Sequence, residues 1–288
     1  MKKANAMIVI AGPTGTGKTQ CAIEIAKRFD AELVGADSVQ VYRGFDIGSA
    51  KPTESELQGI KHHLIDAADP DAPIDAVDYA KLADQAIADI HRRGKTAIVV
   101  GGTGLWLRAL LRGLLDLPKV DAALREMLTN EAHKLGTKTM HTRLAQVDPI
   151  GAKAIHENDT VRIVRALEVY EQTGQALGKL REEHALGEAR YDALHIFLDD
   201  HSPEHQERLN ARADRMIEAG WLSEIEMLLS HYGPHCRALG SVGYRQLLPH
   251  LLASEPLEES LRKAKKQHAF THAANALGFA ASPILVIR

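Results

Sequence analysis

Cysteine is scarce in this sequence. Cys21 and Cys236 are the two cysteines among 288 residues. They do not form a metal-ligand cluster, and they do not suggest a disulfide framework. Such sparing use of cysteine fits the reducing cytosol. We therefore expect a cytoplasmic protein, and 45% hydrophobic residues are enough to give it a large core.

Long hydrophobic runs are also missing. A membrane-spanning helix needs about 18 or more apolar residues without charge, and the sequence has no such run. The first segment, MKKANAMIVIAG, starts with basic residues, but its apolar part is short and leads directly into GPTGTGKT. This arrangement predicts a first buried strand rather than a cleaved signal peptide. We expect no membrane partner.

An excess of positive charge is absent as well. The formal net charge is -3, which disfavours a protein coated in positive potential for nucleic acid. The densest basic patch, RKAKKQH at 262–268, is most simply a solvated helix face. Basic and acidic residues are equal in number between Lys119 and Arg190. Electrostatics alone therefore does not point to an RNA substrate.

What the sequence does contain is an alternation of short apolar strands and amphipathic helices. Strands are expected at 7–11, 32–36, 62–66, 96–100, 192–198 and 283–287, and helices at 18–29, 77–93, 105–115, 203–218, 222–230, 242–252 and 257–277. This alternation predicts an α/β fold in which helices wrap a parallel sheet. The segments from about 122 to 188 are helical, without a convincing strand. We therefore predict a core of residues 1–118 and 191–288 and an all-helical insertion domain at 119–190.

The strongest local motif is GPTGTGKT, which lies between the first strand and the first helix. This is the context of a Walker A motif, so the core is expected to be P-loop NTPase-like. Glycines let backbone N–H groups turn toward phosphate oxygens, and the helix start adds partial positive charge. Lys18 supplies a full charge, and the Thr19 hydroxyl suits a Mg²⁺ ion. The predicted phosphate-binding residues are Gly12, Pro13, Thr14, Gly15, Thr16, Gly17, Lys18 and Thr19.

A carboxylate is missing where ordinary P-loop NTPases place one. Those proteins hold Mg²⁺ with an acidic residue at the end of a second buried strand, but the strand TAIVV ends in Gly-Gly-Thr-Gly. The carboxylate follows the 32–36 strand instead, at Asp37. Asp199 and Asp200 are weaker candidates that suit helix capping. We therefore expect Asp37 near the phosphates, with a role that extends beyond metal binding.

Five segments in order resemble one family. These are GPTGTGKT, ADSVQVYRGFDIGSAKP, HHLID, VVGGTGLWLRALL and HENDTVRIVRALEVYEQTG, and the match runs from about residue 7 to 267. Together they are similar to the tRNA dimethylallyltransferase (tRNA isopentenyltransferase) family. The resemblance implies transfer of a dimethylallyl group from dimethylallyl diphosphate to N6 of the adenosine just 3′ of the anticodon, position 37, in tRNAs that read codons starting with U. It also implies that diphosphate leaves with the help of Mg²⁺, and that the P-loop grips a diphosphate rather than ATP.

The resemblance assigns catalytic roles. It makes Asp37 the base that removes a proton from the amine; the alternatives are a plain Mg²⁺ ligand or a helix cap. It puts the Thr103 hydroxyl near the bridging oxygen of the diphosphate, with an N-cap as the alternative. Arg208 and Arg212 match the family's R-x-x-x-R pair on one helix face. Arg208 is expected to meet the diphosphate, unless it pairs with glutamates on the surface.

The resemblance also implies tRNA contacts. Arg162 and Arg165 would present two cations on one helix face to backbone phosphates, unless they pair with Asp159 and Glu168. Tyr244 is expected either to stack on a base or to pack internally. The predicted tRNA-binding residues are Asp37, Ser38, Val39, Gln40, Thr103, Arg125, Val161, Arg162, Ile163, Val164, Arg165, Gly240, Ser241, Val242, Gly243, Tyr244, Arg245, Lys265, Lys266 and Gln267.

The sequence departs from the family near residue 270. The family's A-K-R-Q-x-T-W-x-R reads AKKQHAFTH here, with Lys266, Ala269, Phe270 and His272 in place of arginine, threonine, tryptophan and arginine. Phe270 can still stack on a base. A histidine that is mostly neutral at pH 7 weakens one positive contact. Affinity for tRNA, or the choice of tRNA, is therefore expected to differ from the family's usual behaviour.

Three other functions stay open. A prenyltransferase of free adenine nucleotides is disfavoured by the helical insertion, since a free nucleotide needs no such reach. A P-loop kinase or NTPase is disfavoured by the missing carboxylate after TAIVV and by DSVQVY. A non-catalytic binding protein is disfavoured because Lys18, Thr19, Asp37 and Thr103 are intact. We expect a monomer, although the sequence does not fix the oligomeric state.

Overall fold

The chain forms two compact units. The computed structural model describes residues 6–115, 117–118, 120–185, 189–200, 202–276 and 284–287, with side chains described except at 184–185, 268–276 and 284–287. The sheet unit comprises Met1–Gly113 and Arg190–Arg288, and the helical unit comprises Leu114–Ala189. The sequence analysis puts the divisions after residues 118 and 190. The first division differs because Leu115 and Leu117 pack against the core of the helical unit.

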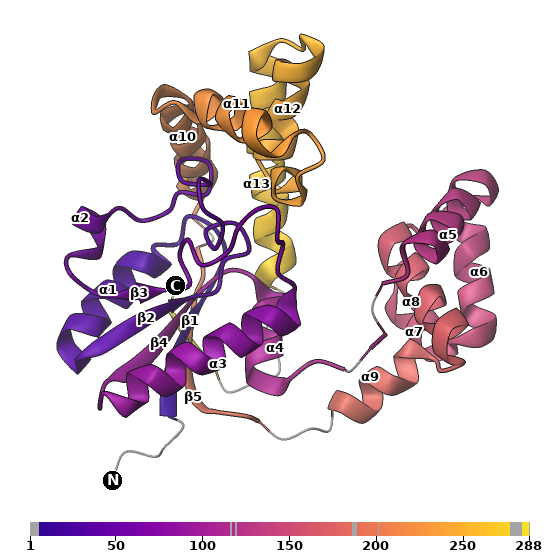
Figure 1. Ribbon diagram of the computed structural model, residues 1–288, viewed down its shortest axis with the longest axis horizontal. Helices are drawn as coiled ribbons and strands as arrows, with labels where there is room; N and C mark the ends of the chain where they lie inside the picture. The colour runs from indigo at the N-terminus through magenta and orange to yellow at the C-terminus, as the bar shows by residue number, and fades with distance from the viewer. Residues whose placement is uncertain are drawn as a thin grey trace. The chain divides into compact units, whose positions relative to one another are not determined.

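The sheet unit contains a six-stranded sheet with the order β3-β2-β4-β1-β5-β6 (Figure 1). Its strands are β1 (Ala6–Ala11), β2 (Ala31–Gly35), β3 (His62–His63), β4 (Thr96–Gly101), β5 (Asp192–Leu198) and β6 (Ile284–Ile287). Every described pairing between them is parallel, which confirms the predicted α/β architecture. In the central strand, Ile8 lies in register with Ile98 of β4 and Leu194 of β5. The segment that follows β1 therefore leaves the sheet near its middle.

Helices cover both faces of the central strands. On one face, α1 (Lys18–Phe29) shares a core with Ile10 and Ile98. The alternate strand residues point to the other face, where α3 (Ala76–Arg92) packs on β2 and β4 and also contacts α4 (Gly104–Arg112) (Figure 1). Strands that are buried on both faces are apolar throughout. That property made AMIVIA and TAIVVG recognisable in the sequence.

A group of helices follows β5 and lies beyond the carboxyl ends of the strands (Figure 1). It consists of α10 (Glu204–Glu218), α11 (Trp221–Tyr232), the 3-10 turn η1 (Arg237–Gly240), α12 (Tyr244–Ala253) and α13 (Leu257–Ala276). Contacts join α10 to α11 and α13, and α12 to α11 and α13. A short helix, α2 (Glu54–Leu57), lies between β2 and β3 in the sequence. The helical group from α10 to α12 supplies residues on two sides of the pocket described below.

The helical unit has its own core. Its helices are α5 (Ala122–Leu135), α6 (Thr137–Val147), α7 (Pro149–Ala154), α8 (Thr160–Thr173) and α9 (Leu177–Ala185). Every element described in this unit is a helix, as the sequence predicted. Leu128, Leu144 and Leu167 are fully buried where α5, α6 and α8 meet. Asp121 and Asp159 cap the starts of α5 and α8 by accepting backbone N–H bonds.

Two expected elements are shorter in the structure, for reasons of backbone geometry. The strand expected at 62–66 is limited to His62–His63, because Leu64 and Asp66 have φ angles of +63° and +53°, outside the extended region. The helix expected at 105–115 ends at Arg112, because Gly113 has φ +76°. Glycine in that conformation commonly ends a helix.

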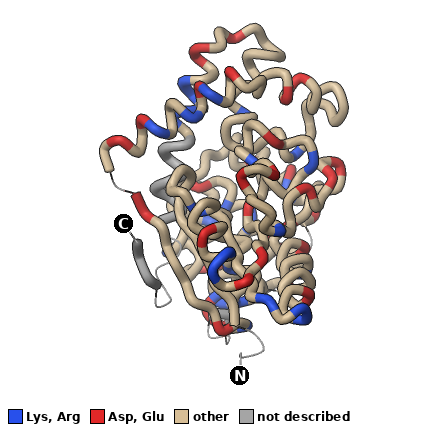
Figure 2. Tube along the Cα trace, turned by 90° about the vertical axis from the view of Figure 1, so that its left-hand side faces the viewer, with Lys and Arg blue, Asp and Glu red and all other residues tan. Residues whose placement is uncertain are grey.

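Charged residues of the two signs are mixed along the chain: acidic and basic residues are interspersed along the trace (Figure 2). Within the described part of the chain, no helix has the length and apolar character needed to cross a membrane.

Candidate active site

Three loops meet at the carboxyl edge of the sheet. The P-loop follows β1, Asp37 follows β2, and Thr103 follows β4. Parallel strands bring their carboxyl ends together, and open α/β sheets bind ligands at this edge. The Ala36 N–H donates to the Val100 carbonyl at 2.8 Å, and the Thr103 N–H donates to the Ala36 carbonyl at 3.1 Å. These bonds hold the loops of Asp37 and Thr103 side by side.

The P-loop has a backbone that requires glycine. Gly15 and Gly17 have φ angles of +84° and +79°, where other residues are strained. A Cβ atom at Gly12 would lie 2.2 Å from the carbonyl oxygen of Leu198, so a larger residue does not fit. Because α1 begins at Lys18, the positive end of its dipole lies at the loop.

Lys18 is the buried charge of this loop. Its Nζ donates to the Pro13 carbonyl at 2.5 Å, and Thr16 Oγ1 donates to the same carbonyl at 2.9 Å. Burial lowers the pKa of Lys18 to about 8, while the Asp37 carboxylate opposes the shift and Arg212 adds to it. Burial disfavours the charged form of such a side chain, so an anionic ligand beside it strongly stabilises that form. The loop is therefore suited to a phosphate group.

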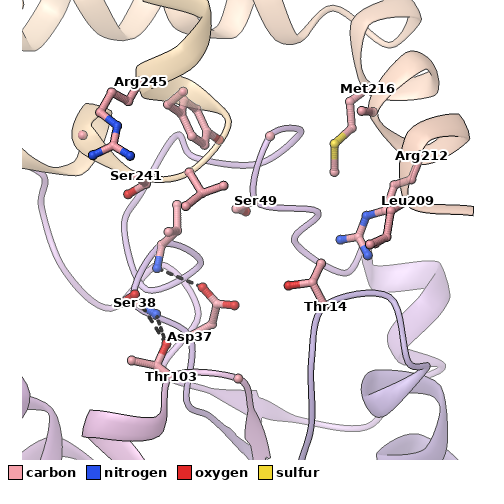
Figure 3. A pocket seen from close by; sticks show the side chains of 17 residues that line it. Thr14, Asp37, Ser38, Ser49, Thr103, Leu209, Arg212, Met216, Ser241 and Arg245 are labelled. Atoms are coloured by element: carbon pink, nitrogen blue, oxygen red, sulfur yellow. Dashed lines mark hydrogen bonds between the residues drawn. The ribbon is translucent and has the colours of Figure 1, made fainter. Parts of the chain in front are cut away.

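A pocket of about 350 Å³ opens beside these loops (Figure 3). Asp37 and Thr103 lie at its floor, Thr14 and Arg212 lie on one side, and Ser241 lies across from them. The other lining residues are Ser38, Val39, Gly48, Ser49, Gly102, Leu209, Ala213, Met216, Gly240, Val242, Tyr244 and Arg245. The pocket thus has Thr14 of the P-loop and Arg212 of α10 on one side and residues of the segment 240–245 on the other.

Asp37 and Thr103 are held by backbone hydrogen bonds. Asp37 Oδ1 accepts from the N–H groups of Val39 at 2.9 Å and Gln40 at 3.2 Å. Thr103 Oγ1 accepts from the Ser38 N–H at 3.0 Å. Although Thr103 precedes α4, its side chain makes no capping bond to that helix. The hydroxyl is instead turned toward the loop of Asp37, at the pocket floor.

The two arginines of α10 differ in their surroundings. Arg208 is half exposed and pairs with Asp200, and its Nη2 lies 3.3 Å from Ser202 Oγ. It therefore has a surface ion pair, with an aspartate rather than with the glutamates considered in the sequence analysis. Arg212, one turn later, lines the pocket; burial lowers its pKa, and the Asp37 carboxylate opposes the shift. Of the two, Arg212 is the one placed to contact a ligand in the pocket.

Several lining residues were missed by the sequence analysis. Leu209, Ala213 and Met216 form an apolar strip along α10, on the helix for which the sequence predicted functional roles only for Arg208 and Arg212. Gly48 and Ser49 also line the pocket, and they lie within the matched segment ADSVQVYRGFDIGSAKP without having been selected. Their position depends on contacts with α11, which the sequence does not reveal.

The segment of residues 240–245 contributes backbone, a hydroxyl and a cation to the pocket wall. Tyr244 in this segment is fully buried. Its ring lies 4.9 Å from that of Phe45 and 5.6 Å from that of Trp221, measured between centroids. Its hydroxyl donates to Glu224 at 2.7 Å. Tyr244 therefore packs internally in the structure, which was one of its two expected roles.

The predicted tRNA-binding arginines of the helical unit are engaged in ion pairs. Arg125 and Arg165 both bind Glu168, which is fully buried, with shortest distances of 2.6 and 2.9 Å. Arg162 lies 3.3 Å from Asp159, but its side chain is 67% exposed. The pairings that the sequence analysis held as alternatives are thus present. Arg162 is the most exposed of these three cations.

The other predicted tRNA contacts, on α8 and on α13, differ in exposure. Val161 is 81% exposed, whereas Ile163 and Val164 are buried in the core. On α13, Lys265 pairs with Asp214 at 2.6 Å and Lys266 is exposed. The side chains of Ala269, Phe270 and His272 lie outside the described residues.

Comparison with known proteins shows where this arrangement belongs. A family model described as IPP transferase matches residues 40–271. The chain is 46% identical over 261 residues to tRNA dimethylallyltransferase 1 of Pelobacter propionicus, which covers 90% of this chain and 84% of that protein. It is 44% identical over 261 residues to tRNA dimethylallyltransferase 2 of Geotalea uraniireducens, with the same two coverages.

Solved structures agree with these sequence relatives. A full-length tRNA isopentenylpyrophosphate transferase from Bacillus halodurans has a TM-score of 0.72 and 31% identity, covering 99% of this chain and 90% of that chain. A eukaryotic dimethylallyltransferase acting on tRNA has a TM-score of 0.76 and 30% identity, covering 94% of this chain and 69% of that chain. Because the family model, the sequence relatives and the solved structures all match over most of its length, the chain belongs to the IPP transferase family.

Proposed function

We propose that this protein transfers a dimethylallyl group from dimethylallyl diphosphate to N6 of the adenosine 3′-adjacent to the anticodon, position 37, in tRNAs that read UNN codons. The observation that carries the proposal is the pocket, in which Asp37 and Thr103 lie between a phosphate-binding side and an opposite wall. A donor diphosphate and an acceptor base can meet at those two side chains. Relatives named tRNA dimethylallyltransferase support the choice of both substrates.

The phosphate-binding side accounts for the leaving group. As the allylic C–O bond breaks, negative charge develops on the departing diphosphate. We assign the stabilisation of that charge to the P-loop amides, Lys18 and Arg212, and donation to the bridging oxygen to the Thr103 hydroxyl; the burial of both cations and the pocket positions of Arg212 and Thr103 support these roles. We assign the guanidinium contact to Arg212 rather than to Arg208, because Arg208 pairs with Asp200 at the surface.

The floor of the pocket accounts for the acceptor. An exocyclic aromatic amine is a weak nucleophile, and it must lose a proton as its new C–N bond forms. The Asp37 carboxylate lies in the pocket and is the base that accepts this proton. Its Oδ1 is fixed by two backbone N–H groups, so the side chain needs little reorientation. The products are the N6-(dimethylallyl)adenosine of the tRNA and free diphosphate.

A divalent metal fits this set of oxygen donors. Thr19 follows the P-loop lysine, and Asp37 is close enough to influence the pKa of that lysine. Hydroxyl and carboxylate oxygens are the hard ligands that Mg²⁺ uses beside substrate phosphates. Among the described residues no group of three His, Cys, Asp or Glu side chains could hold a metal, so phosphate oxygens would complete the ligands. When bound, Mg²⁺ would offset charge on the departing diphosphate.

The RNA is assigned to the side of the pocket opposite the P-loop and to exposed cations elsewhere on the chain. Ser38 and Arg245 line the pocket, and Arg162 and Lys266 are exposed. The target base must leave its stack to reach a pocket of this kind. We propose that the helical unit serves as the tRNA-binding insertion, that the protein acts in the cytoplasm and that it acts as a monomer. Its two free cysteines fit a reducing compartment.

A transfer assay tests the proposal. Purified protein is incubated with radiolabelled dimethylallyl diphosphate, with and without Mg²⁺, and with unmodified tRNA carrying AAA beside its anticodon, AMP or ATP in separate tubes. Label on tRNA alone, dependent on Mg²⁺, is the expected result. Label on the free nucleotides would replace this function with that of a nucleotide prenyltransferase. Hydrolysis of ATP without label on any acceptor would indicate an ordinary P-loop NTPase.

A further inference from the structure

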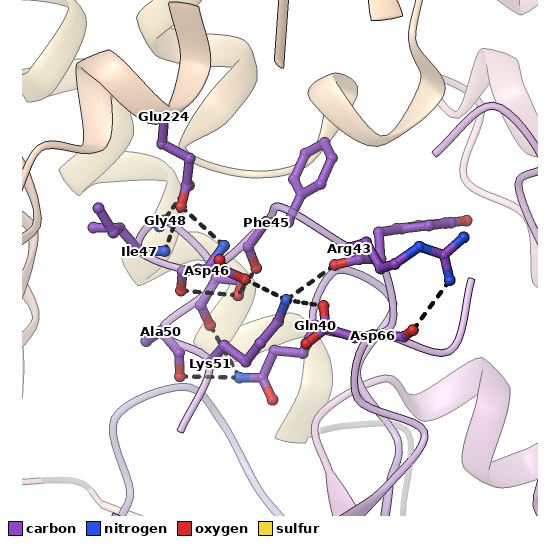
Figure 4. A network of polar contacts seen from close by, with 12 residues as sticks. Gln40, Arg43, Phe45, Asp46, Ile47, Gly48, Ala50, Lys51, Asp66 and Glu224 are labelled. Atoms are coloured by element: carbon purple, nitrogen blue, oxygen red, sulfur yellow. Dashed lines mark hydrogen bonds and ion pairs between the residues drawn. The ribbon is translucent and has the colours of Figure 1, made fainter. Parts of the chain in front are cut away.

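Glu224, near the start of α11, gathers hydrogen bonds from two separate segments (Figure 4). Its Oε2 accepts from the backbone N–H groups of Asp46 at 2.9 Å and Ile47 at 2.6 Å. Its Oε1 accepts from the Gly48 N–H at 3.1 Å and from the Tyr244 hydroxyl at 2.7 Å. The residue is 8% exposed. One buried carboxylate therefore ties residues 46–48 to the first residue of α12.

These two segments are walls of the pocket. Gly48, Ser49 and Tyr244 all line it. A Cβ atom at Gly48 would lie 1.8 Å from Trp221 Nε1 and 2.6 Å from Tyr244 Cζ. The backbone at Gly48 is therefore pressed against two aromatic rings, and it has no room to move toward α11. A change in the anchoring of this loop would move it toward the cavity.

The loop is also fixed from the side of Asp37. Gln40 Nε2 donates to the carbonyls of Ser49 at 3.0 Å and Ala50 at 3.2 Å. Its own backbone N–H donates to Asp37 Oδ1. Lys51, whose side chain is 7% exposed, pairs with Asp46 and Asp66 at 2.5 Å each (Figure 4). A continuous chain of hydrogen bonds thus runs from Asp37 through the loop to the carboxylate of Glu224.

The partners of Glu224 are neutral. They are three backbone amides and one phenol, and burial together with the Glu224 carboxylate raises the pKa of Tyr244, so its hydroxyl keeps its proton. A carboxylate that accepts several hydrogen bonds holds the donor groups firmly in place, because hydrogen bonds to a charged acceptor are about twice as strong as bonds between neutral groups. The charge of Glu224 is thus used to set geometry and not to form an ion pair in the described structure.

We propose that Glu224 is a positioning residue for the acceptor: it sets the shape of the pocket wall against which the adenosine of the tRNA lies. The proposal rests on the function proposed above. On the donor side, Thr14 of the P-loop and Arg212 line the pocket, across from Ser241 and Arg245. A change at Glu224 should therefore alter acceptor binding and leave donor binding intact.

The test compares Glu224→Gln with Glu226→Gln. Glu226 is on the same helix and is exposed, so it is a matched control for loss of one carboxylate. A glutamine at position 224 has the same size as glutamate, but its NH₂ group replaces one acceptor oxygen. The donors that bonded to that oxygen then face another donor. We expect Glu224→Gln to raise the KM for tRNA about tenfold, with the KM for dimethylallyl diphosphate within about twofold of wild type. Glu226→Gln should change neither constant.

A second variant separates positioning from folding. Tyr244→Phe keeps the ring in the wall but removes one of the donors to Glu224, and it should raise the KM for tRNA by about threefold. The double variant should show less than the product of the two effects, because both changes act on one network. If Glu224→Gln does not fold, as judged by circular dichroism, Tyr244→Phe decides the question alone.

Contrary outcomes are distinct. An unchanged KM for tRNA in Glu224→Gln or in Tyr244→Phe would overturn the proposal. So would a fall in kcat alone with both KM values unchanged, since that is the effect of a smaller folded fraction. If the wild-type protein does not prenylate tRNA, the proposed function fails first, and the result is distinguishable because it is measured without any variant.

Discussion

Glu168 of the helical unit and Glu224 of the sheet unit are both buried among several donors, and the donors differ. In the helical unit, Glu168 accepts from Arg125 and lies 2.9 Å from Arg165, so its charge is matched by two cations. In the sheet unit, Glu224 accepts only from neutral groups among its described partners, three backbone amides and the Tyr244 hydroxyl. The first arrangement joins α5 to α8. The second fixes a loop that lines a pocket.

The difference teaches how to separate stabilising charges from functional ones. A cation that is already paired inside the protein has few N–H donors left for a ligand. Arg165 is an example, because it pairs with Glu168 and also donates to the Pro118 carbonyl. At the P-loop and in the pocket, burial disfavours the charged forms of Lys18 and Arg212, with Asp37 as the nearby opposite charge. Perturbed cations that converge on a cavity indicate a binding site. Paired cations in a core indicate stability.

The largest expected effect is on catalysis by the pocket carboxylate. Asp37→Asn keeps an oxygen that can accept from the Val39 and Gln40 amides, but it removes the base. We expect transfer to fall about 10³-fold, with donor binding and thermal stability nearly unchanged. Single-turnover transfer and a melting curve measure both quantities. Wild-type transfer by this variant would remove Asp37 from the mechanism and would break the distinction drawn here.

The next effect is on stability, at the matched glutamate. Glu168→Gln leaves Arg125 and Arg165 without their shared carboxylate, so we expect a loss of about 3 kcal/mol, the lower end for a broken buried pair because Arg125 is 41% exposed. Urea unfolding measures the loss. Glu171→Gln is the control, since Glu171 pairs with Arg143 at a more exposed site and should cost less than about 1 kcal/mol. Equal losses would show that burial of Glu168 does not matter.

The two arginines of α10 sharpen the comparison within one helix. Arg212→Gln should raise the KM for dimethylallyl diphosphate about 30-fold, because a charge-assisted contact to the diphosphate is lost. Arg208→Gln should change it less than about threefold, because its partner is Asp200 at the surface. Initial rates at varied donor concentration provide the measurement. A larger effect at Arg208 would restore the assignment expected from the sequence.

The smallest expected effect concerns RNA affinity. Arg162→Gln should weaken tRNA binding about threefold. It should also reduce, by about one, the steepness with which the logarithm of the tRNA association constant falls with the logarithm of salt concentration, which is the effect of losing one phosphate contact. Arg165→Gln should instead lower the stability of the helical unit, because Arg165 is paired with Glu168. Filter binding at several salt concentrations distinguishes the two. A larger change in salt slope for Arg165 would contradict this assignment.

Much of the fold was predictable, because its signals are local. The strands β1 and β4 are almost entirely apolar runs, and the P-loop is defined by spacing over eight residues. Parallel strands then place Asp37 and Thr103 at one edge, whatever the rest of the chain does. The short strand β3 was overextended, because the left-handed backbone at Leu64 has no clear sequence signal.

The rest of the site depends on tertiary contacts that spacing does not encode. Arg208 and Arg212 are one helical turn apart, and only the packing of α10 against the pocket decides which of them is buried. Glu224 and Gly48 are separated by 176 positions. Nothing in either local sequence indicates that they are bonded. Charge patterns were misleading for a similar reason, since the partner of Arg125 lies 43 positions away.

Because Gly48 lies directly against Trp221 and Tyr244, the two substrate specificities of this enzyme differ in how easily substitutions can change them. The donor side of the pocket takes its side chains from the P-loop and α10, whereas the opposite wall is assembled from segments that hold each other in place. A change of donor can begin with substitutions along α10. A change of acceptor needs coordinated replacements in the loop, in α11 and at the start of α12. We therefore expect the acceptor to be harder to change by substitution than the donor.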